Sequence, residues 1–124
     1  MDKGVGEYQR FIAALPASLR QTVTKYEDAL LSVFTGIRPE SGDVTNLVGA
    51  LTTSDQGALF QVLRDVTHDT LRIIPHQNGR YSLINLEVAQ RVIQAQENRD
   101  LFQEAQQDPR AWLIANPDAW YSTF

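Results

Sequence analysis

Four polar residues near one end of a predicted helix have the types and spacing that acid–base chemistry requires. Asp65, His68, Asp69 and Arg72 recur at three- and four-residue intervals, which places side chains on one side of a helix. A carboxylate beside an imidazole can move a proton or help to hold a metal ion. Charges that solvate or cap a helix end have the same spacing, and nothing nearby supplies a nucleophile or an oxyanion site. We therefore expect solvated or capping charges here, with no catalytic residue and no metal site.

Sequence motifs that carry known chemistry do not occur in the chain. Glycine-rich phosphate and dinucleotide loops, the zinc-protease motif HExxH and the hydrolase motif GxSxG are all absent. The chain also has no cysteine, which excludes disulfides, thiolate nucleophiles and cysteine-based zinc sites. We therefore expect a non-enzymatic protein without a cofactor.

The length and amino-acid composition are typical of one small globular domain. The chain has 124 residues, of which 43% are hydrophobic, and a formal net charge of −4. No apolar run approaches the roughly 20 residues of a membrane span, and the first residues lack the apolar stretch of a secretory signal. An acidic chain does not attract nucleic acids or anionic membranes through its overall charge. We expect a single domain, 1–124, that is cytoplasmic and does not bind membranes.

Apolar periodicity predicts two helices in the N-terminal third. A first short helix, with its apolar stripe from Tyr8 to Leu15, ends at Pro16. A capping-box pattern at Ser18 predicts a second helix, 18–35, that stops at Gly36. This helix carries a heptad seam too short for a free coiled coil, so we expect it to be the central packing element, although a homodimer through the seam stays open. The seam consists of Leu19, Val23, Tyr26, Leu30, Val33 and Ile37.

Two further helices and a hairpin follow. Asp43 is the predicted N-cap of a helix over 43–51, and a capping box at Thr53 predicts a helix that reaches Asp69. Asn78-Gly79 then predicts a two-residue turn in a hairpin over about 70–86, with Ile73 opposite Ile84. In that register Leu71, Ile73, Ile84 and Leu86 face the helices, whereas Arg72, Ile74, His76, Tyr81, Leu83 and Asn85 lie on the other face. Asn85 caps the next helix, which we expect to continue to about residue 105.

The predicted fold is mainly helical: a compact bundle of five to six helices with one β-hairpin. Its order of helix, helix, turn, helix, hairpin and helix resembles a winged helix, with 54–69 as the recognition helix and Asn78-Gly79 as the wing tip. That resemblance implies a DNA-binding regulator. The start of the recognition helix, Asp55 to Phe60, lacks the residues with which DNA readers contact bases. The residues that would contact nucleic acid are Arg64, Arg72, His76 and Arg80.

The C-terminal extension, 108–124, contains an internal repeat. Asp108-Pro109-Arg110-Ala111-Trp112 is echoed by Asn116-Pro117-Asp118-Ala119-Trp120. Each unit pairs an N-capping residue with proline at the first helical position and a tryptophan one turn later. Trp, Tyr and Arg are common interface anchors, although these aromatics could instead complete the core. We therefore expect a protein–protein interaction module, an adaptor, assembly factor or inhibitor, that contacts another protein or a second copy. The candidate contact residues are Arg110, Trp112, Trp120, Tyr121 and Phe124.

Overall fold

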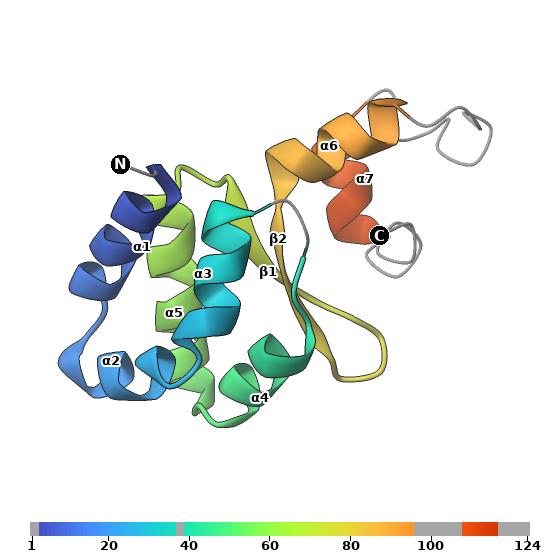
Figure 1. Ribbon diagram of the computed structural model, residues 1–124. Coiled ribbons are helices and arrows are strands. Elements are labelled where there is room, and N and C mark those ends of the chain that lie inside the picture. Colours follow the sequence, from blue (N-terminus) through green and yellow to red (C-terminus); the bar gives the residue numbers. More distant parts are fainter. Residues whose placement is uncertain (1–2, 37–38, 96–107, 117–124) are drawn as a thin grey trace.

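A hairpin with helices on both faces organises the molecule (Figure 1). The computed structural model describes residues 3–36, 39–95 and 108–116, with only the backbone described at 92–95 and 109–110. The mainly helical prediction with one hairpin is confirmed, and the described residues form seven helices where we predicted five to six. The elements are α1 (Lys3–Ala14), α2 (Ala17–Thr24), α3 (Glu27–Thr35), α4 (Gly42–Gly49), α5 (Thr53–Val66), β1 (Leu71–Pro75), β2 (Tyr81–Asn85), α6 (Leu86–Ala95) and α7 (Pro109–Ala115).

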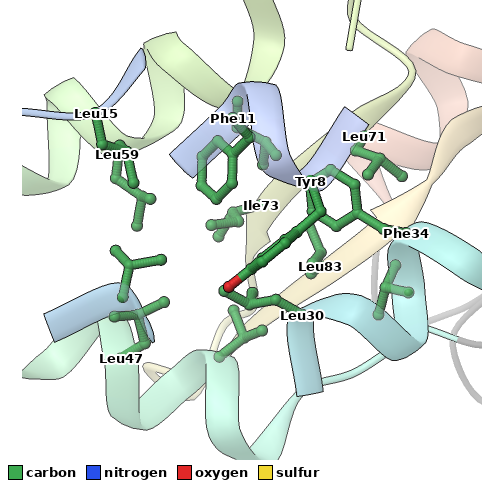
Figure 2. Close-up of a cluster of buried hydrophobic side chains, with 14 of the residues drawn as sticks. Tyr8, Phe11, Leu15, Leu30, Phe34, Leu47, Leu59, Leu71, Ile73 and Leu83 are labelled. Atoms are coloured by element: carbon green, nitrogen blue, oxygen red, sulfur yellow. The ribbon is translucent and has the colours of Figure 1, made fainter. Parts of the chain in front are cut away.

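The main core lies between the N-terminal helices and one face of the hairpin (Figure 2). The predicted stripe of the first helix supplies Tyr8, Phe11 and Leu15, and the rings of Tyr8 and Phe34 of α3 form a T-shaped pair with a centroid distance of 5.4 Å. The α1 and α3 backbones approach closely at Gly4, where a Cβ would lie 2.2 Å from the Phe34 carbonyl oxygen. Glycine therefore permits the contact between these two helices.

The predicted helix 18–35 is in fact two helices, α2 and α3, joined at Lys25 and Tyr26. Tyr26 leaves the helical conformation, with φ −110° and ψ 23°. The Thr24 hydroxyl donates to the Arg20 carbonyl at 2.9 Å and to the Gln21 carbonyl at 3.2 Å, so a side chain satisfies carbonyls at the end of α2. The buried part of the heptad seam nevertheless packs within the chain, as predicted; it consists of Leu19, Val23, Leu30 and Val33.

The residues that cap the starts of α4 and α5 differ from the predicted ones. The Glu40 carboxylate, not Asp43, accepts hydrogen bonds from the first turn of α4, from the Asp43 and Val44 amides at 2.9 Å each. Thr52, one residue before the predicted Thr53, accepts from the Asp55 amide at 3.1 Å and caps α5. In both places the residue that satisfies the free amides lies outside the helix, as the geometry of an N-terminus requires.

The hairpin register differs by one residue from the prediction. Ile73 faces Leu83, not Ile84, and the connection is the three-residue loop Gln77–Gly79. Gly79 closes it in the left-handed conformation, at φ 79°, as glycine does in three-residue hairpin loops. A one-residue shift reverses the faces of a strand. Leu83 therefore joins the main core, whereas Ile84 lies on the opposite face.

The second hairpin face is also buried, under α6 and α7 (Figure 1). Asn85 caps α6 as predicted, because its side-chain oxygen accepts from the Glu87 amide at 3.0 Å and from the Val88 amide at 3.2 Å. The predicted continuation of this helix to about residue 105 lies outside the described residues. The buried residues of this side are Ile74, Ile84, Leu86, Ala89 and Leu113, with Trp112 packed against them.

Candidate functional site

Helix α7 is the first unit of the C-terminal repeat. As predicted, the Asp108 side chain accepts from the Ala111 amide at 3.2 Å, and Pro109 occupies the start of the helix. The second unit contributes to the first: the Asn116 amide side chain donates to the Trp112 carbonyl at 3.0 Å. Residues of the repeat therefore form hydrogen bonds with backbone groups at both ends of α7. The sequence predicted Asn116 as the N-cap of the second unit and did not indicate its hydrogen bond to the end of α7.

Successive side chains of α7 have different exposures. Leu113 is completely buried in the cluster on the second hairpin face, and Trp112 packs half-buried against that cluster. Among the described residues, Ile114 is the one large hydrophobic residue with an exposed side chain, at 38%. The backbone of Arg110 belongs to α7, whereas Trp120, Tyr121 and Phe124 lie outside the described residues. Of the five predicted contact side chains, Trp112 is thus the one whose surroundings the structure describes.

The proposed nucleic-acid residues Arg64 and Arg72 converge on Asp69. The Arg64 Nε lies 3.4 Å from an Asp69 carboxylate oxygen, and the Arg72 Nε donates to the same oxygen at 3.2 Å. The hydrogen bond from Arg72 holds the pKa of the Asp69 carboxyl below its usual value. His68 and Asp69 are both left-handed, at φ 52° and 64°. Asp69 therefore ties the end of α5 to the start of β1 through both arginines.

The four residues at helical spacing, Asp65, His68, Asp69 and Arg72, do not assemble as one group. Asp65 accepts a hydrogen bond from Gln61 at 2.8 Å, one turn earlier on α5, whereas Asp69 pairs with Arg72 beyond the helix end. The turn at His68 ends the helical spacing that would have placed the four side chains on one side of a helix. Within the described part of the chain, no group of three acidic, histidine or cysteine residues could hold a metal ion.

At the other end of the hairpin, His76 and Arg80 contact two buried serines. The His76 Nε2 and the Ser82 hydroxyl are 2.5 Å apart, and the Arg80 guanidinium donates to the Ser41 hydroxyl at 3.3 Å. A serine–histidine contact has the geometry of an activated nucleophile, and the sequence analysis missed it because the two residues meet across the hairpin. However, Ser82 is only 1% exposed. A substrate could not reach its hydroxyl, so the contact serves to satisfy a buried polar group.

A cleft of about 670 Å³ lies where α1 meets the end of α5 and the start of α6. Its walls carry charges of both signs, Lys3 and Arg10 against Glu7 and Glu87. This cleft was not predicted, because its walls come from four separate parts of the sequence, 3–10, Phe34, 66–70 and 85–87. Its mixed charge selects no single class of ligand.

Comparisons with protein-family models, with curated proteins and with solved structures give no match for this chain. None of the helices in the described ranges is long and apolar enough to cross a membrane.

Proposed function

We propose that the chain is a non-enzymatic protein–protein interaction module, an adaptor, assembly factor or inhibitor, that contacts its partner through the C-terminal segment 108–124. The observation that supports this proposal most directly is the exposure pattern of α7. Leu113 holds the helix on the hairpin, while Ile114 is exposed and Trp112 is half-buried. Interface hot spots combine such a fixed support with aromatic and apolar side chains that a partner can bury.

The composition agrees with this proposal. Arg110, Trp112, Trp120 and Tyr121 stand within twelve residues of sequence, and Trp, Tyr and Arg are the residues most enriched at hot spots. A cytoplasmic location, which the absence of cysteine favours, is part of the proposal.

The test compares two neighbouring exposed positions of α7. Wild type, Ile114→Asp and Ala115→Asp are immobilised and exposed to nuclease-treated extract of the native source, and bound proteins are quantified by mass spectrometry. We expect wild type and Ala115→Asp to retain a stoichiometric protein partner. Ile114→Asp should bind that partner at least about tenfold more weakly, which corresponds to about 1.4 kcal/mol of binding free energy. All three chains should melt at the same temperature, because both residues are exposed. Equal recovery on all three chains would contradict the proposal.

A winged-helix-like DNA-binding regulator is the second candidate. The observation in its favour is an isolated β-bridge between Glu40 and Leu83, with backbone hydrogen bonds of 3.1 and 2.8 Å, at the edge of the two-stranded hairpin. Glu40 lies between α3 and α4, so the bridge residue, two helices and the hairpin follow one another in the chain. The pairing of Arg64 and Arg72 with Asp69 weighs against this function, because it neutralises part of the basic surface.

Salt-dependent binding to duplex DNA tests this second function. We expect the double variant Arg72→Ala/Arg80→Ala to abolish such binding, and Arg20→Ala, an exposed arginine on α2, to preserve it. The absence of any DNA binding by the wild type at low salt would rule out the regulator.

A further inference from the structure

The hairpin loop contains an asparagine followed by a glycine that the loop geometry requires. Gly79 has φ 79°, a left-handed conformation that residues with a side chain adopt only at a cost. Asn78 and Gly79 are both exposed. The Asn78 carboxamide oxygen accepts a hydrogen bond from the Arg80 amide at 3.3 Å, which is the Asx-turn arrangement. The ring that this hydrogen bond closes contains the Gly79 amide, so the Asn78 carboxamide and the Gly79 nitrogen are held near each other.

The Gly79 amide nitrogen is available as a nucleophile. It has no hydrogen-bond acceptor among the described residues, and glycine has no side chain to shield it. The Arg80 amide points at the oxygen that would gain negative charge if Asn78 were attacked, and a donor in this position stabilises such an oxyanion. The loop therefore holds a nucleophile, an electrophilic carbon and a hydrogen-bond donor together.

We propose that Asn78 is a self-modification site, at which the carboxamide loses ammonia and the residue becomes aspartate or isoaspartate. The Gly79 nitrogen bonds to the Asn78 carboxamide carbon, the carbon–nitrogen bond of the carboxamide breaks, and the Gly79 amide proton leaves with the ammonia. This step closes a five-membered succinimide ring. Water then opens the ring: breaking the new carbon–nitrogen bond gives aspartate, and breaking the original peptide bond gives isoaspartate. The inference goes beyond the proposed function, because the loop lies outside the segment 108–124.

A second asparagine shows what blocks the same reaction. The Asn85 side chain is held in a similar way, because its oxygen accepts from the Glu87 amide, two residues further on, at 3.0 Å. The residue between them, Leu86, is completely buried, and its amide donates to the Thr70 carbonyl at 2.8 Å. The nitrogen that would attack Asn85 is therefore shielded and already hydrogen-bonded. Asn78 and Asn85 form a matched pair within one chain.

The two products affect the hairpin differently. Aspartate keeps the acceptor for the Arg80 amide, and its charge strengthens that hydrogen bond. Isoaspartate adds a methylene group to the backbone of a loop that is closed by the hydrogen bond from the His76 amide to the Arg80 carbonyl, at 2.8 Å. We expect isoaspartate to weaken this end of the hairpin, where Arg80 also donates to the Ser41 hydroxyl at 3.3 Å.

Trypsin separates the two asparagines for the test. It cuts after arginine and therefore releases the neighbouring peptides 73–80 and 81–91. Folded wild type is incubated at mildly alkaline pH and digested at intervals, and chromatography with mass spectrometry quantifies the amide, aspartyl and isoaspartyl forms of each peptide. A sample digested without incubation gives the background. We expect Asn78 to lose its amide at least about tenfold faster than Asn85, with isoaspartate among the products and ammonia released in equal amount.

Two controls locate the reaction and measure its dependence on the fold. Asn78→Gln keeps an exposed carboxamide in the loop but would have to close a six-membered ring, so it should release at least about tenfold less ammonia than wild type. Wild type unfolded in guanidinium chloride gives the rate without the loop geometry. We expect the folded rate at Asn78 to be no more than about threefold lower, because the loop leaves the Gly79 nitrogen free.

Four results would overturn the inference. A rate at Asn78 that is less than tenfold above the rate at Asn85 would show that the free glycine nitrogen does not control the reaction. A folded rate more than threefold below the unfolded rate would show that the loop protects Asn78. Aspartate without isoaspartate would mean that water attacks the carboxamide directly. Undiminished ammonia release from Asn78→Gln would place its source elsewhere in the chain.

Discussion

The Thr45 hydroxyl accepts a hydrogen bond from the Tyr81 amide at 2.9 Å and donates one to the Tyr81 carbonyl at 3.1 Å. This side chain of α4 thereby binds both backbone groups that Tyr81 turns away from β1, and the Ser41 hydroxyl donates a second hydrogen bond to the Tyr81 carbonyl at 2.8 Å. The backbone of Glu40 does the same for Leu83, two residues further along β2. A two-stranded hairpin is marginal in water on its own. The segment 40–45 therefore stabilises the hairpin by closing the outer edge of β2.

Replacing Thr45 should accordingly weaken the hairpin. Thr45→Val keeps the shape of the side chain but removes both hydrogen bonds; the Tyr81 carbonyl keeps its hydrogen bond from the Ser41 hydroxyl, whereas the Tyr81 amide loses its acceptor. We expect the free energy of unfolding to fall by about 1–3 kcal/mol in urea titrations. Thr53→Val, at an exposed position in the first turn of α5, should change it by less than about 0.5 kcal/mol. Equal stability of the two variants would contradict this account of the edge.

Two glycines of α1 should respond in opposite directions to alanine. At Gly4 the new methyl group would lie 2.2 Å from the Phe34 carbonyl oxygen, whereas at Gly6 its nearest neighbour, 3.7 Å away, is the end of the Arg10 side chain. We expect Gly4→Ala to lower the free energy of unfolding by about 1–3 kcal/mol, because the α1 and α3 backbones must separate. Gly6→Ala should stabilise by up to about 1 kcal/mol through helix propensity. Thermal melts of both variants check the prediction, and a stable Gly4→Ala chain would contradict the close packing of α1 on α3.

The pairing of Asp69 predicts a pH-dependent contribution to stability. Its folded-state pKa is lowered, first by the hydrogen bond from Arg72 and also by the charges of Arg72 and Arg64. The contribution is therefore present above the unfolded-state pKa of about 3.9 and is lost as the pH falls through the lower folded-state value. Asn tolerates the left-handed backbone of this position, so Asp69→Asn removes the charge with little added strain.

Melting temperatures at several pH values test this contribution. We expect wild type to melt above Asp69→Asn at neutral pH, and the difference to shrink as the pH falls below about 4. Asp65→Asn, which leaves the Asp69 pairs intact, serves as the control. A difference between wild type and Asp69→Asn that stays constant with pH would show that the carboxylate charge contributes nothing.

The Tyr8 hydroxyl is buried in the main core (Figure 2). It has no hydrogen-bond partner of normal geometry among the described residues, and burial, followed by the charge of Glu27, raises its pKa. Tyr8→Phe keeps the ring against Phe34 and should leave stability unchanged or raise it by about 1 kcal/mol. Phe11→Tyr, which adds a hydroxyl at a residue only 1% exposed, should lower it by about 1–3 kcal/mol. Denaturant titrations of both variants check the pair, and a clear loss in Tyr8→Phe would mean that the hydroxyl is bonded in solution.

Much of the fold could be predicted because its signals are local. The stripe from Tyr8 to Leu15, the cap at Asn85 and the Asp108-Pro109 helix start each depend on a few neighbouring residues. The break at Tyr26 has no glycine or proline to indicate it, so helical periodicity continued through it.

The candidate site depended more on long-range contacts. Asp69 was expected to cap or solvate a helix end, but its pairing with Arg64 and Arg72 follows from the turn at His68, which no residue pattern indicates. The Ser82–His76 contact follows from hairpin pairing, which brings together side chains that local spacing does not relate. The exposure of Ile114 likewise depends on which side of α7 packs on the second hairpin face.

The hairpin register is the prediction that went wrong through ambiguity, and it can be tested chemically. Leu83 and Ile84 are both apolar, so alternation alone could not decide which of them faces the helices, and Asn78-Gly79 fits loops of two or three residues. In the observed register Pro75 faces Tyr81. Because the Tyr81 amide and carbonyl turn toward Thr45, these residues form a pair without mutual hydrogen bonds, in which cross-strand side chains lie closest.

In a chain without cysteine, Pro75→Cys/Tyr81→Cys should therefore form a disulfide on mild oxidation. In the matched variant, Pro75→Cys/Ser82→Cys, the cysteines stand at the positions that would face each other if the turn had two residues. This variant should retain both free thiols, because Ser82 pairs with Ile74 and its side chain points to the opposite face from that of Tyr81. Mass spectrometry after alkylation of free thiols distinguishes the two results. Preferential oxidation of the Ser82 variant would show that the two-residue turn is the one formed in solution, and that Ile84, not Leu83, packs on the N-terminal helices.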